Sequence, residues 1–429
     1  MAISSMELAP LVTGQGMGRA LSGQQPDTVC SDQEQFGRLG LGDVVVVRRR
    51  ELAQRRKSQG FSQEALAERL GVDEKTVRRW ENGTTSEGPQ PWLRPKLAAA
   101  LQVMPDELEE VIASDRRGED SRIAHSVRNP RGTDMMVVAG LRAEVQELGR
   151  QYDRAPSTSL LAKTGECLGQ VAFLRGNVSN EHVRHELLSV EAEAATLMGQ
   201  LVWDASQRRD HTTAHRYFDD AITAARSLGD SAAESRALLR KSFVALYGEK
   251  DPAAGLQFTM RTAEAADSSR VLKGLAVLHA AEAHAMRGER SDCERALNEA
   301  DLDFDKIGRD DVAIDLFSPS QSGRLAGSCY LFLGKPELAQ PILEMTSHEL
   351  PDWSKSRSIV LGNLGLACIR QGKLDEAVGV LHGAVDVIES TWGGGGLNIV
   401  FGACRELQPW RGVDAVQDVY DRVMTLMTA

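Results

Sequence analysis

Residues 61–83 read FSQEALAERLGVDEKTVRRWENG, and this stretch decides the fold of the N-terminal part of the chain. Ser62 stands where a helix N-cap belongs, and two leucines follow it at helical spacing. Gly71 breaks that pattern two residues before Asp73, which is a second N-cap. The stretch therefore predicts a helix, a tight turn and a second helix over about 74–82.

The second predicted helix has two chemically different faces. Val77 and Trp80 lie three residues apart, so both would be buried against the preceding helix. This spacing predicts that Trp80 belongs to the core and is not a stacking platform. Lys75, Arg78 and Arg79 occupy the opposite face. Two short helices with an apolar inner stripe and a basic outer face are what a DNA-reading helix-turn-helix requires.

Charge is distributed unevenly along the 429 residues. The whole chain carries a net charge of −11, but residues 48–96 hold 12 Lys or Arg against 7 Asp or Glu, a local balance of +5 that leaves −16 elsewhere. An acidic chain of this kind does not coat nucleic acid along its whole surface. A small basic head on an acidic body suits the binding of one DNA site.

Three further helices complete the predicted head. One begins near Asp43 and ends at Gly60, and two follow the glycine of the helix-turn-helix, over about 92–101 and 105–112. The first carries a basic cluster: Arg48, Arg49, Arg50, Arg55, Arg56 and Lys57. We expect some of these residues, Arg55 and Arg56 among them, to contact phosphates; the alternative is a solvated basic face.

These residues resemble the Xre family, the Cro and phage-repressor type of helix-turn-helix. The resemblance covers residues 48–113 and rests on eight residues at the family spacing: Gln63, Ala67, Gly71, Val77, Trp80, Glu81, Asn82 and Gly83. It implies a five-helix, lambda-repressor-like domain in which Gln63 holds a phosphate. It also implies that Glu74, Lys75 and Arg79 point at base edges, while Thr76 and Arg78 lie beside the DNA backbone.

The chemistry of these side chains agrees with the implied roles. Arg79 can donate two hydrogen bonds to guanine O6 and N7, and Lys75 can donate to the same atoms less rigidly. Each good base contact discriminates by about 1–3 kcal/mol, so the contacts of one half-site are too few to select a genomic site. We therefore expect a homodimer on double-stranded DNA with a palindromic operator.

The remaining chain divides by composition. Residues 1–40 are rich in Gly, Ser and Gln and are predicted to be a disordered tail, the head covers 41–113, and the polar residues 114–134 are predicted to be a linker. The body, residues 135–429, is Ala- and Leu-rich and is predicted to be helical to its end. The fold class is therefore all-α.

Cellular location is predicted from three absences in the sequence. No apolar run is long enough to span a membrane, and the N-terminus lacks the pattern of a signal peptide. The six scattered cysteines include no CxxC pair, which predicts free, buried thiols. We expect a cytoplasmic protein with no membrane partner.

A spacing recurs along the body. Small, large and small residues stand at A-x3-F/L-x2-A spacing in two clear copies and two weaker ones, with a doubtful copy between them; the copies are Ala214, Phe218, Ala221; Ala254, Phe258; Cys293, Leu297, Ala300; Ala339, Leu343, Thr346; and Ala377, Leu381, Ala384. Successive starts lie 40, 39, 46 and 38 residues apart. A repeated pair of helices fits this pattern, because small residues let two helices approach while the large one fills the gap.

The last copies resemble tetratricopeptide repeats. The resemblance rests on Leu364, Gly365, Cys368, Gly372, Ala377, Leu381 and Ala384, and on Gly327, Tyr330, Gly334 and Ala339 in the copy before. It implies an α-solenoid whose concave groove binds a peptide or a small ligand. By repeat position, the residues facing that groove would be His279, Glu282, Arg324 and Asn363; the alternative is that these side chains are simply solvated. The four glycines after Trp392, followed by Pro409, are predicted to interrupt the array near its end.

The sequence contains no recognised catalytic or metal-binding motif. The segment EHVRHE places His182, His185 and Glu186 close together, but it is not the HExxH pattern of a metal site. Walker loops, GxSxG and paired cysteines are missing as well. We predict a non-enzymatic protein with no cofactor and no metal.

Taken together, the order of domains resembles bacterial transcription regulators whose repeat domain senses a signal and assembles the dimer. This resemblance implies a sequence-specific regulator. The alternative comes from a different class: the repeat body is a protein-docking scaffold, and the helix-turn-helix head only tethers a partner.

Overall fold

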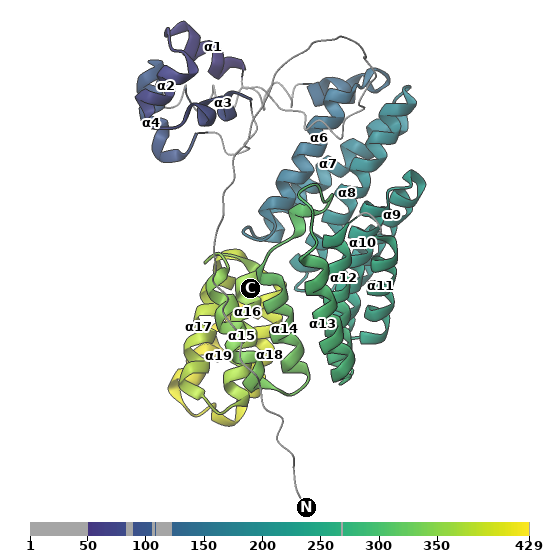
Figure 1. Cartoon of the computed structure of the whole chain (residues 1–429), viewed down its shortest axis with the longest axis vertical. Coiled ribbons are helices and arrows are strands. Elements are labelled where there is room, and N and C mark those ends of the chain that lie inside the picture. The colour runs from purple at the N-terminus through teal and green to yellow at the C-terminus, as the bar shows by residue number, and fades with distance from the viewer. Residues whose placement is uncertain (1–49, 83–88, 105–107, 109–121, 267–268, 429) are drawn as a thin grey trace, which may run out of the picture. The chain divides into compact units, whose positions relative to one another are not determined.

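The computed structural model describes residues 50–82, 89–104, 108, 122–266 and 269–428 (Figure 1). Every regular element in those ranges is a helix, which confirms the all-α prediction. The predicted tail over 1–40, the start of the first helix at Asp43, the predicted helix over 105–112 and Cys30 lie outside the described residues. None of the described helices is both long and apolar enough to cross a membrane.

The head consists of α1 (Arg50–Ser58), α2 (Gln63–Leu70), α3 (Glu74–Asn82), the 3₁₀ turn η1 (Pro91–Leu93) and α4 (Arg94–Leu101). The predicted helix-turn-helix is confirmed. Ser62 caps α2 by accepting from the Ala65 amide at 2.9 Å, and Asp73 accepts from the Lys75 amide at 2.8 Å. Gly71 ends α2 with φ of 72°, a left-handed backbone that favours glycine and turns the chain sharply toward α3.

The core of the head joins all of these helices. Val77 is 1% exposed and Trp80 is 4% exposed, so the interpretation of Trp80 as a core residue is confirmed. Eleven other buried residues share this core: Leu52, Leu66, Ala67, Leu70, Leu93, Leu97, Ala98, Ala100, Leu101, Val103 and Leu108. Helix α3 is therefore held through this buried face, while Glu74, Lys75, Arg78 and Arg79 on its other side are exposed.

The described part of the body begins earlier than its composition predicted. Residues 122–128 are helical and the 3₁₀ turn η2 (Pro130–Gly132) follows them, inside the segment predicted to be linker. Ile123 is buried and packs with Val137 and Leu141. The linker prediction is therefore wrong for these residues, because Ile123 and Val127 anchor an otherwise polar segment to the body.

The body is a run of helices that pack on their neighbours in the sequence, while alternate helices such as α6 and α8, α12 and α14, and α16 and α18 also touch. The helices are α6 (Met135–Gln151), α7 (Ser157–Asn177), α8 (Glu181–Ala205), α9 (His211–Leu228), α10 (Ser231–Phe243), η3 (Val244–Glu249), α11 (Pro252–Ala265), α12 (Arg270–Met286), α13 (Arg290–Phe304), η4 (Ile314–Leu316), α14 (Ser320–Phe332), α15 (Pro336–Glu349), α16 (Lys355–Arg370), α17 (Leu374–Thr391), α18 (Gly394–Glu406), η5 (Gln408–Trp410) and α19 (Asp414–Thr428). Figure 1 shows them side by side, and η3 is a π-helical turn. This is the predicted tetratricopeptide-like α-solenoid.

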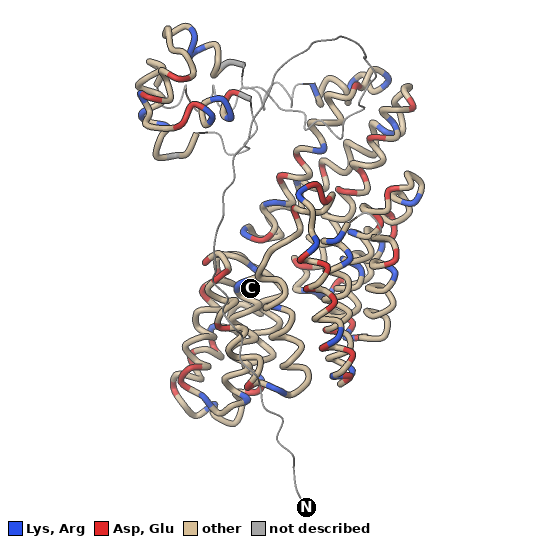
Figure 2. The backbone as a smooth tube through the Cα atoms, in the orientation of Figure 1, with Lys and Arg blue, Asp and Glu red and all other residues tan. Residues whose placement is uncertain are grey.

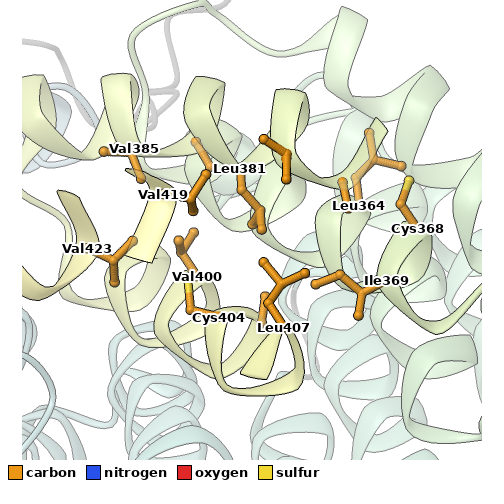
Figure 3. Close-up of a cluster of buried hydrophobic side chains, with 14 of the residues drawn as sticks. Leu364, Cys368, Ile369, Leu381, Val385, Val400, Cys404, Leu407, Val419 and Val423 are labelled. Atoms are coloured by element: carbon orange, nitrogen blue, oxygen red, sulfur yellow. The ribbon is translucent and has the colours of Figure 1, made fainter. Parts of the chain in front are cut away.

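Small residues set the spacing within helix pairs, as the repeat predicted. A Cβ added to Gly327 of α14 would lie 2.4 Å from the side chain of Leu343 in α15, and one added to Gly365 of α16 would lie 2.7 Å from Leu381 in α17. The large residue of the second helix therefore fills the space that the glycine of the first leaves open. Figure 3 shows Leu381 in the core that α16 to α19 share.

One copy of the repeat is displaced from its predicted register. Helix α11 turns Gly255, Thr259 and Thr262 inward, whereas Ala254 and Phe258 are half-buried. The doubtful copy therefore begins one residue later than predicted. A Cβ on Gly255 would lie 2.3 Å from Leu246, so glycine replaces alanine here for the same reason of close approach.

The glycine run after Trp392 continues the array and does not interrupt it. Gly394 opens α18, and a Cβ there would lie 2.6 Å from the backbone oxygen of Asp204. A Cβ on Gly396 would lie 2.0 Å from the Ser358 hydroxyl. The prediction is wrong because these glycines serve a close contact between α18 and the helices α8 and α16, which lie far away in the sequence.

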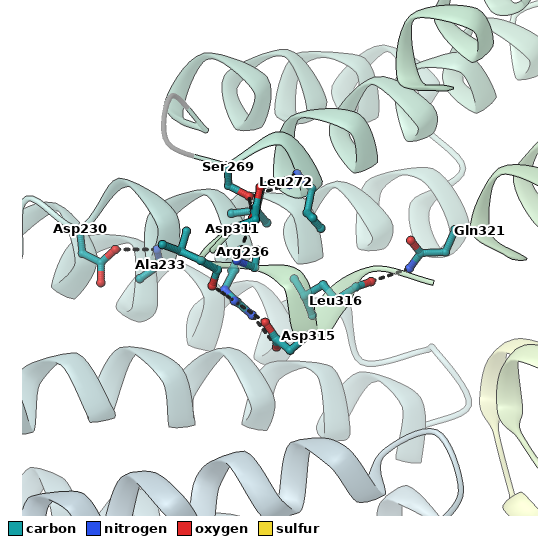
Figure 4. Close-up of polar contacts among 12 residues, drawn as sticks. Asp230, Ala233, Arg236, Ser269, Leu272, Asp311, Asp315, Leu316 and Gln321 are labelled. Carbon is teal, nitrogen blue, oxygen red and sulfur yellow. Dashed lines mark hydrogen bonds and ion pairs between the residues drawn. The ribbon is translucent and has the colours of Figure 1, made fainter. Parts of the chain in front are cut away.

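The longest repeat spacing contains the connection between α13 and α14, which is fastened to earlier helices (Figure 4). Asp311 accepts from the Ser269 hydroxyl at 2.6 Å and from the Arg270 amide at 2.8 Å. Asp315 accepts two hydrogen bonds from Arg236, at 2.8 and 3.0 Å. These contacts tie the connection to α10 and α12.

The described cysteines agree with the prediction of buried thiols. Cys167, Cys293, Cys329, Cys368 and Cys404 are all free and buried. Burial raises the pKa of the Cys167 and Cys404 thiols to about 12. These two thiols therefore stay protonated and unreactive near neutral pH.

Candidate nucleic-acid interface and inner polar cluster

The outer face of α3 is the first candidate site. Glu74, Lys75, Arg78 and Arg79 are exposed, and Thr76 is half-buried at the side of the helix. Figure 2 shows basic residues on the head helices. Because Val77 and Trp80 hold α3 from behind, the exposed residues form a surface that a groove of DNA can meet.

A buried ion pair fixes α3 to α1. Arg56 donates to the two carboxylate oxygens of Glu81 at 2.5 and 3.1 Å, and also to the Phe61 backbone oxygen at 2.6 Å. The side chains of Arg56 and Glu81 are only 7% and 5% exposed. Paired, two-pronged contacts of this kind hold geometry strongly. The pair therefore ties the C-terminal part of α3 to α1.

This geometry corrects the expected role of Arg56. Its guanidinium is buried and committed to Glu81, so it is a structural residue and is not presented to a phosphate. A basic cluster in the sequence does not reveal which member turns inward. Arg55 is half-buried beside it and keeps its phosphate role as a proposal.

Gln63 occupies the predicted place at the start of α2, but its amide is partly engaged. Its Nε2 atom donates to Glu81 at 2.6 Å. An amide nitrogen has two hydrogens, so one donor and the carbonyl oxygen of this half-buried side chain remain. The contact orients Gln63 through the same carboxylate that orients α3.

A second group of polar side chains lies inside the body, where η3, α12 and α14 meet; we call Tyr247, His279, Glu282 and Ser328 the inner polar cluster. The Tyr247 hydroxyl lies 2.6 Å from His279 Nδ1 and donates to one oxygen of Glu282. The Ser328 hydroxyl donates to the other oxygen. The structure thus brings His279 and Glu282 together as predicted, but each is only 3% exposed and surrounded by partners.

Burial controls the protonation of the inner polar cluster. Burial, with the neighbouring Glu282 charge, raises the pKa of Tyr247 well above its ordinary value. Burial lowers the pKa of His279, so its ring is neutral at pH 7. Burial opposes ionisation of Glu282, but hydrogen bonds with His279, Ser328 and Tyr247 bring its pKa below the ordinary value. The cluster therefore holds one carboxylate charge.

The two remaining predicted groove residues lie on successive helix pairs. Arg324 is half-buried on α14, one turn before Ser328, so the two side chains share a face. Asn363 is 7% exposed on α16 and has no hydrogen-bond partner in the described part of the chain. The structure therefore groups Arg324 with the inner polar cluster, and among the described residues it shows no hydrogen bond between Arg324 and Asn363.

Sequence reasoning missed Tyr247, Ser328 and two arginines, Arg208 and Arg240, that lie near the cluster. Tyr247 belongs to the π-helical turn η3 and Arg208 follows the end of α8, so neither obeys the helical repeat. Ser328 was available as the residue four after Arg324, on the same helical face.

The described ranges contain one group of side chains whose spacing could suit a metal ion. His284, Glu289 and Asp292 are the group there that brings three possible ligand atoms within 4.8 Å of one another. His284 Nδ1 lies 2.7 Å from a Glu289 oxygen, which is an ordinary side-chain contact. The segment EHVRHE, which the sequence did not favour as a metal site, forms no such group in the described ranges: Glu186 pairs with Arg142 at 3.2 Å, and His182 and His185 are exposed.

Comparison with known proteins gives one family match. Residues 52–87 match the model of a family described as helix-turn-helix. No curated protein matches the chain.

Two solved structures from Bacillus thuringiensis resemble the chain. PlcR in complex with the peptide PapR7 and DNA is 16% identical over 60% of this chain and 94% of its own, with a TM-score of 0.28. The apo form of the quorum sensor NprR is 11% identical over 74% of this chain and 99% of its own, with a TM-score of 0.41.

Proposed function

We propose that this chain, whose residues 52–87 belong to the Xre type of helix-turn-helix domains, is a sequence-specific and dimeric DNA-binding transcription regulator without enzymatic activity, and that its helical-repeat body senses a peptide or small ligand. The observation that carries the proposal is the division of α3 into a face buried at Val77 and Trp80 and an exposed basic face. A helix held from behind and basic in front is built for the major groove.

In this proposal the exposed residues divide into two roles. Lys75 and Arg79 read base edges, where Arg79 pairs with guanine and Glu74 accepts from cytosine N4. Thr76 and Arg78 lie by the DNA backbone, together with Gln63 and Arg55, and they fix the register without reading sequence. The buried pair of Arg56 and Glu81 supports both roles, because it holds α3 and Gln63 in place.

A dimer follows from the small number of base contacts in one head. A few contacts of about 1–3 kcal/mol each give too little discrimination among genomic sites, whereas two heads on a palindrome double it. The half-sites are then about 34 Å apart, one turn of DNA.

The test begins with immunoprecipitation of the protein with its genomic DNA, followed by binding of the purified full chain to an enriched site. Arg79→Ala and Lys75→Ala are each expected to weaken binding by about 1–3 kcal/mol per half-site, because each removes a base contact from an exposed face. Arg69→Ala is the matched control: it removes an exposed charge of the same domain, at the end of α2 opposite Gln63.

A palindromic site lost with Arg79→Ala but kept with Arg69→Ala supports the proposal. Binding that is indifferent to both Arg79→Ala and Lys75→Ala contradicts it. The protein-docking scaffold would then be the better description.

Arg78 gives a separate prediction, because a backbone contact changes the salt dependence and not the sequence preference. Arg78→Ala is expected to weaken binding to matched and mismatched sites by the same factor. It should also reduce the slope of log affinity against log salt by about one per half-site. Titrations at several salt concentrations measure this. A selective loss on the matched site alone would move Arg78 to the base-reading group.

A further inference from the structure

Three arginines near the inner polar cluster indicate what kind of ligand the body takes. Arg208 follows α8, Arg240 is on α10 and Arg324 is on α14, and all three are half-buried. Within the described residues none of them pairs with a carboxylate. Arginine charges held inside a protein normally have an anionic partner.

The Arg208 guanidinium stacks near two aromatic rings, and one of them belongs to Tyr247 of the inner polar cluster. Its guanidinium carbon lies 4.6 Å from the ring centre of Trp203 and 6.0 Å from that of Tyr247. Its Nε atom is buried and has no hydrogen-bond partner among the residues that the structure describes. An unpaired buried donor raises the free energy of the folded chain.

Arg240 and Arg324 approach the cluster from other helices. The Arg240 guanidinium lies 5.3 Å from the ring of Phe243, whose centre is 4.3 Å from the ring of His279. Arg324 lies on the face of α14 that presents Ser328 to the cluster. Arg240 and Arg324 also add to the effect of burial in lowering the pKa of His279, so both charges are felt at one ring.

The carboxylates of this region are already engaged. Asp204 pairs with Lys355 at 3.0 Å, and Asp315 pairs with Arg236 at 2.8 Å. Glu282 accepts from Tyr247 and Ser328 and is the one carboxylate of the inner polar cluster. Three arginine charges against this one carboxylate leave an excess of two positive charges.

The start of α18 adds to this excess. A Cβ on Gly395 would lie 2.1 Å from an Arg208 nitrogen, so the guanidinium lies directly against the first turn of that helix. The N-cap Gly393 has no side chain to accept from the free amides of this turn. A helix N-terminus favours a negative charge, yet here it meets a positive one. Gln207 and Arg208, just before this contact, have a left-handed backbone with φ of 53° and 60°, which is unfavourable for residues other than glycine.

We propose that Arg208, Arg240 and Arg324, with the first turn of α18, form a binding site for a ligand that carries two negative charges on carboxylate or phosphate groups. The inference rests on the proposed sensing function and gives it a chemical class. Guanidinium forks bind both kinds of group in pairs of hydrogen bonds. A ligand of this charge balances the excess that the three arginines carry over the one carboxylate of the inner polar cluster.

The test is calorimetric titration of the full-length protein, without DNA, in a zwitterionic buffer. Three probes are used: inorganic phosphate, succinate, and an acetylated Ala-Leu-Glu tripeptide with a free C-terminus. We expect binding of at least one probe, weakened about tenfold or more by Arg240→Met and by Arg324→Met. Arg261→Met, which removes an exposed arginine of α11, is the matched control and should bind as the parent does.

Folding is checked by thermal unfolding of each variant without ligand. Because methionine removes an unbalanced charge and keeps the length of the side chain, neither Arg240→Met nor Arg324→Met should unfold at a lower temperature than the parent. If one does, the lysine variant at the same position replaces it, Arg240→Lys or Arg324→Lys, since lysine keeps the charge and loses the two-pronged donor.

The probes separate the sources of the anion. Binding of phosphate alone indicates a phosphorylated ligand, and binding of succinate or the tripeptide indicates a carboxylate; either result supports the site. Absence of binding by all three, or binding unchanged in both arginine variants, overturns it. Since no DNA is present, loss of this site would leave the DNA-binding proposal standing, and loss of DNA binding would leave the site.

Discussion

Replacing Glu81 with alanine is expected to destabilise the head strongly. The substitution leaves the Arg56 guanidinium buried without its carboxylate, and removing one partner of a buried pair costs about 3–5 kcal/mol. Gln63 loses the acceptor that orients it at the same time. A small domain has only about 5–15 kcal/mol of stability in total, so this loss is a large share.

Hydrogen exchange of the full-length protein measures the effect locally. Amides in peptides from residues 52–82 and 89–101 should exchange about a hundredfold faster or more in Glu81→Ala, while the helices of the body keep their protection. Glu64→Ala removes an exposed carboxylate of the same domain and should change nothing. Sequence-specific DNA binding should be lost together with the protection.

A double substitution shows whether the unpaired charge is the cause. Arg56→Met with Glu81→Leu replaces the pair by apolar side chains of similar size and should restore most of the protection. Unchanged exchange in Glu81→Ala would mean that α3 is held by Val77 and Trp80 alone. The pair would then have no part in presenting the helix.

The helix-turn-helix could be predicted from the sequence because its rules are local. The caps at Ser62 and Asp73, the turn at Gly71 and the spacing of Val77 and Trp80 all depend on residues a few positions apart. The role of Arg56 could not be predicted, because its partner Glu81 is 25 residues away and its neighbours are also basic. Which cation turns inward is decided by tertiary packing.

In the body, too, contacts between neighbouring helices could be predicted from the sequence, whereas contacts between distant segments could not. The small–large–small spacing predicted which helices pair, since that contact is made between helices adjacent in the sequence. The purpose of the glycines after Trp392 depends on Asp204, almost two hundred residues earlier, and no local pattern contains it. For the inner polar cluster, periodicity supplied His279, Glu282 and Arg324, and it missed the partners that lie on the π-helical turn and after α8.

The second large effect is expected at a buried ion pair that joins α7 and α8 to α16. Lys355 Nζ lies 3.0 Å from an Asp204 oxygen and 2.7 Å from the Ser157 hydroxyl. Ser157 donates to the same Asp204 oxygen at 2.7 Å. The lysine and aspartate side chains are 4% and 2% exposed. Helices α7 and α8 are therefore bound to α16 across some 150 to 200 residues of sequence.

Lys355→Met is expected to destabilise this junction by about 3–5 kcal/mol, because Asp204 would remain buried with a single hydroxyl as its partner. Exchange of amides in peptides spanning 153–160, 201–208 and 355–362 should rise, and those of α12 and α13 should rise less. Lys306→Met, which removes an exposed lysine, is the control and should leave all of them unchanged.

Replacing both Lys355 and Asp204 by apolar residues shows whether the pair stabilises the body or positions the ligand site. Burial lowers the pKa of Lys355 even though Asp204 raises it, so the attraction does not offset the loss of hydration. Lys355→Met with Asp204→Leu should therefore be at least as stable as the parent. Asp204 lies against the first turn of α18, and Arg208 follows four residues later against the same turn. If the double variant is stable but binds the anionic probes more weakly, the pair positions the ligand site; if binding is unchanged, the junction serves closure of the body alone.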